Sequence, residues 1–168
     1  MANFQSDYAK RLRPMPTPQG GEIVNVRMQV AVTAALALND IIEFGELPVD
    51  CVPVDFVLDS SDIDTGGSPS VTLSVGVANA GKTDLDTSAD SGSAVWLSAS
   101  TIGQAGGMAR PTTRAMFIAT PRQPDPNSGS ASGAQLRMIA AKVAAAGATP
   151  AAGTVSLSLS YRAAHYGA

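Results

Sequence analysis

The 168-residue sequence contains only one cysteine, Cys51, and only one histidine, His165. A single cysteine excludes an intrachain disulfide and a zinc cluster built from cysteines. Cys51 lies in an apolar run, where a thiol behaves as a small hydrophobic side chain. His165 lies near the end of the sequence, where the backbone is rarely fixed well enough for a general base. We therefore expect no catalytic residues and do not interpret the protein as an enzyme.

Charged and aromatic residues are also scarce, at 15% and 5% of the sequence, and the net charge is −3. An acidic chain has no overall positive field to attract nucleic acid or an anionic membrane surface. The longest apolar runs, such as residues 30–38, fall well short of the roughly 20 residues that a membrane span requires, and no signal-like segment opens the sequence. We expect a soluble protein with no nucleic-acid partner, no membrane contact and no cofactor.

Hydrophobic residues nevertheless make up 45% of the sequence, and in several segments they alternate with polar residues. In residues 22–33, valines and one methionine occupy every second position, which is the period of a half-buried strand. The same alternation marks residues 71–77 and 155–161. Pro53 has no amide hydrogen, so we expect it at a sheet edge, a strand start or a bulge. Shorter strands are expected at residues 41–44, 54–58, 94–102 and 114–120.

Residues 135–146 are ambiguous, because propensity and pattern disagree there. The segment is rich in alanine, leucine and methionine, which favours a helix. Its side chains also alternate, and a short loop at residues 147–153 leads into the strand at 155–161. A regular strand needs a neighbour to satisfy its backbone groups, so we expect the two segments to form a hairpin. With this strand the count reaches about eight, which predicts an all-β antiparallel β-sandwich or jelly roll.

Residues 1–21 differ in composition from residues 22–168, which we expect to form one β-sandwich (jelly-roll) domain. Prolines remove backbone donors and favour extended conformations, so the first 21 residues are predicted to form an extended N-terminal arm. Two interpretations stay open, a disordered tail or an arm that becomes ordered on a partner presenting carboxylates. The candidate binding residues of the arm are Lys10, Arg11, Arg13, Pro14, Pro16 and Pro18.

Two acidic segments raise the question of a cation site. The first runs from Asp59 through Asp62 to Asp64, a spacing similar to that of calcium-binding loops, but it lacks the bidentate glutamate that closes an EF-hand. Aspartates also form turns by bonding to their own backbone. The second segment contains Asp84, Asp86 and Asp90. We interpret both segments as turn-forming and expect no metal site, with a calcium site as the alternative.

Residues 38–48 consist of Leu-Asn-Asp-Ile-Ile-Glu-Phe-Gly-Glu-Leu-Pro and end in a leucine-proline turn. Residues 51–77 follow with a strand, an acidic Asp-Thr-Gly-Gly loop and a second strand, and residues 151–162 end in Val-Ser-Leu-Ser-Leu-Ser-Tyr-Arg. In this order the segments resemble small head proteins of tailed bacteriophages. The resemblance covers roughly residues 22–80 and 135–162.

The resemblance implies a jelly-roll decoration protein, also called a cement protein. Such a protein binds the outer surface of the shell formed by the major capsid protein, stabilises neighbouring capsomers and is often a homotrimer. For this chain it implies a place in the virion, on the capsid outer surface, after assembly in the host cytoplasm.

The residues themselves leave a second class open, a carbohydrate-binding or adhesion module of a virion. Such modules share the sandwich fold and normally present aromatic platforms to the sugar. The aromatic residues that would have to supply a platform are few and scattered. They are Tyr8, Trp96, Tyr161 and Tyr166.

Overall fold

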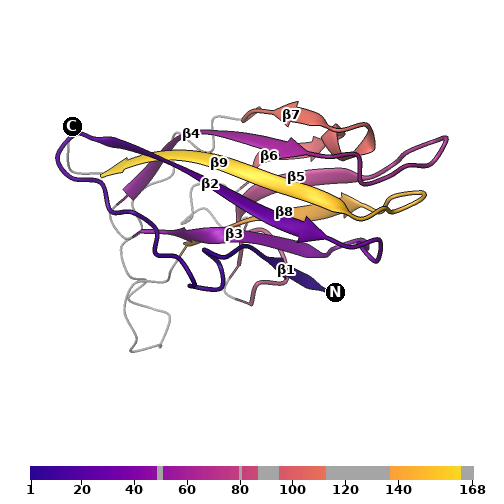
Figure 1. Cartoon of the computed structure of the whole chain (residues 1–168), viewed down its shortest axis with the longest axis horizontal. Helices are drawn as coiled ribbons and strands as arrows, with labels where there is room; N and C mark the ends of the chain where they lie inside the picture. Colours follow the sequence, from indigo (N-terminus) through magenta and orange to yellow (C-terminus); the bar gives the residue numbers. More distant parts are fainter. Residues whose placement is uncertain (49–50, 80, 87–94, 113–136, 164–168) are drawn as a thin grey trace.

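The computed structural model describes residues 1–48, 51–79, 81–86, 95–112 and 137–163, whose strands form two sheets packed face to face (Figure 1). The strands are β1 (Asn3–Gln5), β2 (Ile23–Val32), β3 (Ile41–Leu47), β4 (Cys51–Ser60), β5 (Thr72–Val77), β6 (Val95–Ser100), β7 (Gly107–Ala109), β8 (Arg137–Ala145) and β9 (Gly153–Ala163). One sheet has the order β1-β3-β8-β5-β6 and the other the order β2-β9-β4-β7. The expected all-β, mainly antiparallel sandwich is confirmed.

The four-stranded sheet has one face in the core and the other toward solvent. Along β2, the buried side chains of Val26, Met28 and Val30 alternate with exposed ones. β2 pairs antiparallel with β9, so that Val30 lies opposite Val155, and β9 pairs with β4 on its other side. The strands expected from the alternation at residues 22–33 and 155–161 are therefore confirmed.

The five-stranded sheet is buried on both faces near its centre, which explains its alanine-rich strand. β8 lies between β3 and β5, and its small residues Ala140 and Ala141 are fully buried on opposite faces. The strand expected at residues 135–146 is confirmed, but the expected hairpin is wrong. β8 and β9 lie in different sheets, because each satisfies its backbone groups with strands that are distant in the sequence.

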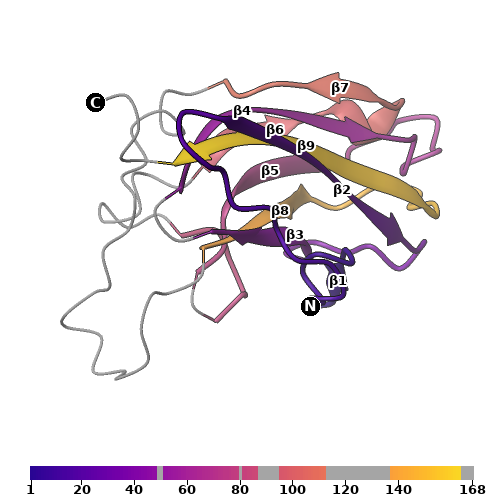
Figure 2. The same cartoon turned by 60° about the vertical axis from the view of Figure 1, so that its left-hand side comes forward.

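The two sheets face each other (Figure 2). The core between them is filled mainly by aliphatic side chains from both inner faces. Its largest members include Phe56 and Trp96, whose ring centroids lie 6.0 Å apart. Cys51 is buried in the same cluster, as expected for a thiol in an apolar run. Some of the few aromatic residues of the chain are thus buried in the core.

A smaller apolar cluster covers the outer face of the five-stranded sheet. The 78–86 loop contributes Ala78 and Leu85, which pack with residues of β3 and β8. Two ion pairs hold this loop on the sheet: the loop supplies the cation in one pair and the anion in the other. Lys82 Nζ lies 2.9 Å from Glu43 Oε2, and Lys142 Nζ lies 2.7 Å from Asp84 Oδ1. The hydrogen bond from Lys142 lowers the pKa of Asp84.

Three further expectations can be compared with the structure. A register shift between Pro53 and Asp55 marks a bulge in β4, one of the positions expected for a strand proline. The expected strand at residues 114–120 lies outside the described residues. The alternation pattern does not reveal the short edge strand β7 or the 3₁₀ turn Ile102–Gln104 that precedes it. In the described part of the chain, no helix has the length and apolar character needed to cross a membrane.

Candidate functional site

The candidate binding residues lie in an N-terminal segment, residues 1–18, that packs along one side of the sandwich. Its strand β1 pairs parallel with β3, with Phe4 opposite Ile42. Ser6 and Ala9 are buried, and Phe4, Tyr8 and Met15 pack against the main core. These contacts place the segment on its own domain, an arrangement that the composition of residues 1–21 did not reveal.

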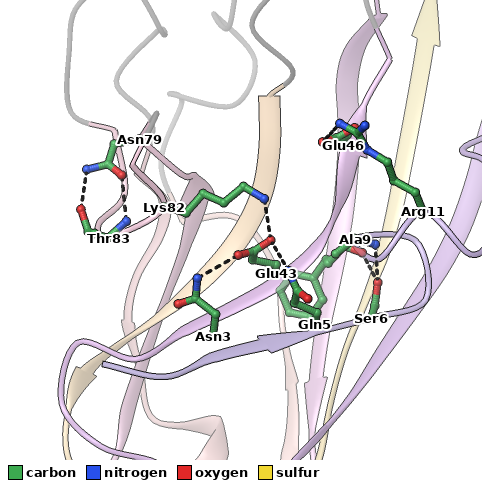
Figure 3. Close-up of polar contacts among 11 residues, drawn as sticks. Asn3, Gln5, Ser6, Ala9, Arg11, Glu43, Glu46, Asn79, Lys82 and Thr83 are labelled. Carbon is green, nitrogen blue, oxygen red and sulfur yellow. Dashed lines mark hydrogen bonds and ion pairs between the residues drawn. The ribbon is translucent and has the colours of Figure 1, made fainter.

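A buried carboxylate fixes the start of this segment (Figure 3). Glu43 of β3 has no exposed surface. Its Oε1 accepts a hydrogen bond from Asn3 Nδ2 at 3.1 Å, and its Oε2 accepts one from Gln5 Nε2 at 3.1 Å. The ammonium group of Lys82 completes the set at 2.9 Å from Oε2. Glu43 thus joins β1 and the 78–86 loop to β3 through one buried charge.

A turn after β1 presents the basic residues. The hydroxyl of Ser6 donates to the carbonyl of Phe44 and accepts from the amides of Tyr8 and Ala9, at 3.1 and 3.2 Å. The amide of Lys10 donates to the carbonyl of Ser6 at 3.0 Å, which closes a helix-like turn. Ser6 therefore caps the turn in the way that serine caps the N-terminus of a helix.

The proline-rich part of the segment is fixed by a tyrosine from the opposite end of the sequence. Tyr161 of β9 is fully buried, and its hydroxyl donates to the carbonyl of Pro16 at 2.5 Å. Burial also raises the pKa of Tyr161, so the hydroxyl keeps its proton and remains a donor. Pro18 is itself buried.

We expect the Tyr161→Phe variant to lose about 1 kcal/mol of unfolding free energy, because a partly buried hydrogen bond is removed and the Pro16 carbonyl loses its partner. Chemical denaturation checks the loss, and hydrogen exchange should become faster at Glu22, whose amide donates to the Gln19 carbonyl at 3.3 Å. The control is Ser160→Ala, which removes an exposed hydrogen bond to Asn25. Equal effects of the two variants would contradict a fixing role for Tyr161.

The candidate arm residues differ in their surroundings. Lys10 is exposed. Arg11 forms an ion pair with Glu46 at 3.0 Å, whereas Arg13 lies 3.8 Å from Asp7. Exposed pairs of this kind contribute at most about 1 kcal/mol.

A groove of about 390 Å³ lies between the segment and β3. Its walls comprise Tyr8, Pro14, Met15 and Pro48, with Arg11, Arg13 and Glu46 alongside. A second hollow of about 210 Å³ shares Tyr8 and Arg13 with it and extends to Arg27 and Gln29 of β2. We call the first hollow the Arg13 groove.

The aspartates of the acidic loop after β4 are bound by partners within the protein. Asp59 pairs with Arg27 at 3.0 Å, and Asp62 Oδ1 accepts the amide of Asp64 at 3.0 Å. Asp64 is fully buried, and its two oxygens are occupied by four backbone amides. Among the described residues, no group of three potential metal ligands is present. The structure thus does not gather Asp59, Asp62 and Asp64 into one group of ligands, and Asp90 lies outside the described residues.

The structure also bears on the carbohydrate alternative. Trp96 and Tyr161 are fully buried, so neither side chain is available as a stacking platform. Tyr8 of the N-terminal segment is half-buried against the main core, and Tyr166 lies outside the described residues. His165, the weak candidate for a catalytic base, lies outside them as well.

Comparison with solved structures gives two strong similarities. The chain is 35% identical to one from "Capsid of Ralstonia phage GP4", with a TM-score of 0.77 and 99% of each chain covered. It is 26% identical to one from "Cyanophage Pam1 capsid asymmetric unit", with a TM-score of 0.61 over 90% of this chain and 94% of that one. No protein-family model and no curated protein matches the sequence.

Proposed function

Because the chain belongs to a family of bacteriophage capsid proteins, we propose that it decorates the outer surface of the shell, where it binds the major capsid protein and cements neighbouring capsomers. The observation that carries this proposal is the similarity to capsid chains along nearly the whole length, together with the resemblance of residues 22–80 and 135–162 to small head proteins. A structural role in the virion needs no reacting group.

A decorating role is supported by the resemblance of residues 22–80 and 135–162 to small head proteins, and the two packed sheets provide a rigid body for it. We infer that three copies associate, since several weak contacts made together raise the avidity of attachment. A solution mass near that of three chains is the expected result, and a monomer at working concentration would contradict this part of the proposal.

Deletion of residues 2–19 should strongly reduce the occupancy of this protein on purified capsids, because the candidate binding residues are removed. Co-sedimentation with shells assembled without the protein measures the effect. The deletion also removes core contacts of Tyr8 and Met15, so circular dichroism must first show a folded β protein. A Lys10→Ala/Arg11→Ala/Arg13→Ala variant keeps the segment in place and tests the same surface. Unchanged occupancy for this variant and the deletion would exclude the N-terminal segment as the attachment surface.

A further inference from the structure

The Arg13 groove has walls that suit an extended chain. Tyr8, Pro14 and Pro48 provide an aromatic ring and two proline rings, and proline has no backbone N–H to offer a ligand. Such walls favour contact with apolar side chains. The second hollow shares Tyr8 and Arg13 with the groove and reaches Arg27 and Gln29 of β2, so the two hollows adjoin at these residues, and we call them together the path.

The groove is rigid because its walls are tied to the sandwich. At Gly45 of β3, an added Cβ would lie 2.8 Å from Met28 Sδ and 3.2 Å from Tyr8 Cβ. Tyr8 therefore packs closely against the β3 backbone. Next to the lining residues Pro14 and Met15, the carbonyl of Pro16 accepts a hydrogen bond from the hydroxyl of Tyr161. A wall that is already ordered reduces the entropy that binding must overcome.

The charged side chains along the two hollows favour a negatively charged ligand. Three guanidinium groups, those of Arg11, Arg13 and Arg27, are 69%, 66% and 59% exposed. Only two carboxylates, those of Asp7 and Glu46, line the same path. Arg27 is also paired with Asp59, at 3.0 Å, so the least engaged positive charge along the two hollows is that of Arg13.

Arg13 is the most available of the three cations. It lines both hollows, and its separation from Asp7, 3.8 Å, is longer than the 3.0 Å that separates Arg11 from Glu46. An exposed pair this loose contributes little. An incoming carboxylate can therefore replace Asp7 at small cost and form the shorter, paired contact that guanidinium groups make with carboxylates.

We propose that the Arg13 groove binds an extended, acidic segment of the major capsid protein, with a carboxylate on Arg13 and apolar side chains against Tyr8 and the proline walls. This inference rests on the proposed function and adds the surface and the chemistry of the partner. It differs from attachment through a free arm, because the N-terminal segment acts here as one wall of a preformed site.

Charge reversal tests the proposal. We expect Arg13→Glu to bind shells assembled without this protein about tenfold more weakly than the unchanged chain, with the difference shrinking as salt is raised. The control is Arg110→Glu, since Arg110 is also 69% exposed and ion-paired but lies beyond β7, outside the lining of the Arg13 groove. Arg13→Glu binding as tightly as Arg110→Glu would overturn the proposal. If the unchanged chain itself fails to bind shells, the proposed function fails instead.

A zero-length cross-link identifies the partner group. In Arg13→Lys, carbodiimide should join the new amine to an aspartate or glutamate of the major capsid protein, and mass spectrometry should locate it in an acidic segment. Arg110→Lys should give no such product. A cross-link from position 13 only to Asp7, or to a second copy of this chain, would overturn the proposal, as would binding that is abolished by nuclease.

Discussion

The Asp64→Asn variant is expected to lower the melting temperature by at least about 5 °C, because a buried carboxylate that organises two loops is neutralised. Asp64 Oδ2 accepts the amides of Ser70, Val71 and Ala148 at 2.6, 3.1 and 3.0 Å. Asp64 Oδ1 accepts the amide of Thr149 at 2.7 Å. The carboxylate thus joins the loop before β5 to the loop between β8 and β9, which connects the two sheets.

An asparagine cannot replace this arrangement. In either orientation its amide nitrogen, a donor, faces at least one of the four backbone donors, and its single oxygen carries no full charge. Loss of the acceptor for the buried Val71 amide costs more than the loss of an ordinary hydrogen bond, and the amides of Ser70, Ala148 and Thr149 are partly buried. We therefore expect a larger effect than from a substitution on the surface of the same loop.

The pH dependence of stability gives a second readout. Burial raises the pKa of Asp64, but hydrogen bonds from Thr149, Ser70, Val71 and Ala148 outweigh it and lower the pKa from 3.8 to about 2. Because the folded-state pKa lies below the unfolded one, the stabilisation is complete above pH about 4 and is lost as the pH falls toward about 2. Asp64→Asn should flatten the stability profile in this interval.

The control for this prediction is Asp62→Asn. Asp62 is exposed and accepts only the amide of Asp64, at 3.0 Å. Thermal unfolding followed between pH 2 and 6 compares the two variants with the unchanged chain. Equal melting temperatures for Asp62→Asn and Asp64→Asn would contradict a structural role for the buried carboxylate. So would an Asp64→Asn variant that loses as much stability at acidic pH as the unchanged chain.

The sequence predicts strands well where one face of the sheet is buried and the other is exposed to solvent. β2 and β9 lie in the four-stranded sheet with one solvent face, so their side chains alternate visibly. β8 is buried on both faces, so the room between its neighbours favours small apolar side chains. Its alanine-rich composition therefore resembles that of a helix. Strand pairing was not predictable from proximity in the sequence, because the loop between β8 and β9 crosses from one sheet to the other.

The candidate site was predicted only in part. Composition identified Lys10, Arg11, Arg13 and the prolines, but it gave no sign that the segment packs on its own domain. The residues that fix it, Glu43 and Tyr161, are distant in the sequence and become neighbours only after folding. One signal was present at Glu43, a charged residue within the apolar run at residues 41–44. A charge at such a position needs partners when it is buried.

Glu43→Ala is expected to reduce the unfolding free energy by about 2 kcal/mol, since it removes three hydrogen bonds around a buried charge. The loss stays moderate because Asn3 is exposed and Lys82 is partly exposed, so both can turn to water. The control is Glu46→Ala on the same strand. Its partner Arg11 is 69% exposed, and removal of such a pair should change stability by no more than about 0.5 kcal/mol.

The more specific result concerns which amides become less protected. Glu43 holds β1 and the 78–86 loop through a single side chain, so Glu43→Ala should accelerate exchange at Lys10 and Leu12 and also at Asn79 and Lys82. Amides in the centre of β9 should change only in proportion to global stability. Faster exchange in one of the two segments alone would show that they are held independently.

A double-mutant cycle separates the ion pair from the amide contacts. If Lys82 stabilises the 78–86 loop through Glu43, Lys82→Met should have little effect in the Glu43→Ala background, and the coupling should be about 1 kcal/mol or more. The two substitutions together should still loosen β1, because Asn3 and Gln5 lose their acceptor whatever residue occupies position 82. Tyr8, Arg11 and Arg13 line the Arg13 groove and follow β1 in the chain, so Glu43→Ala should also weaken binding to shells although it alters no lining residue of the groove.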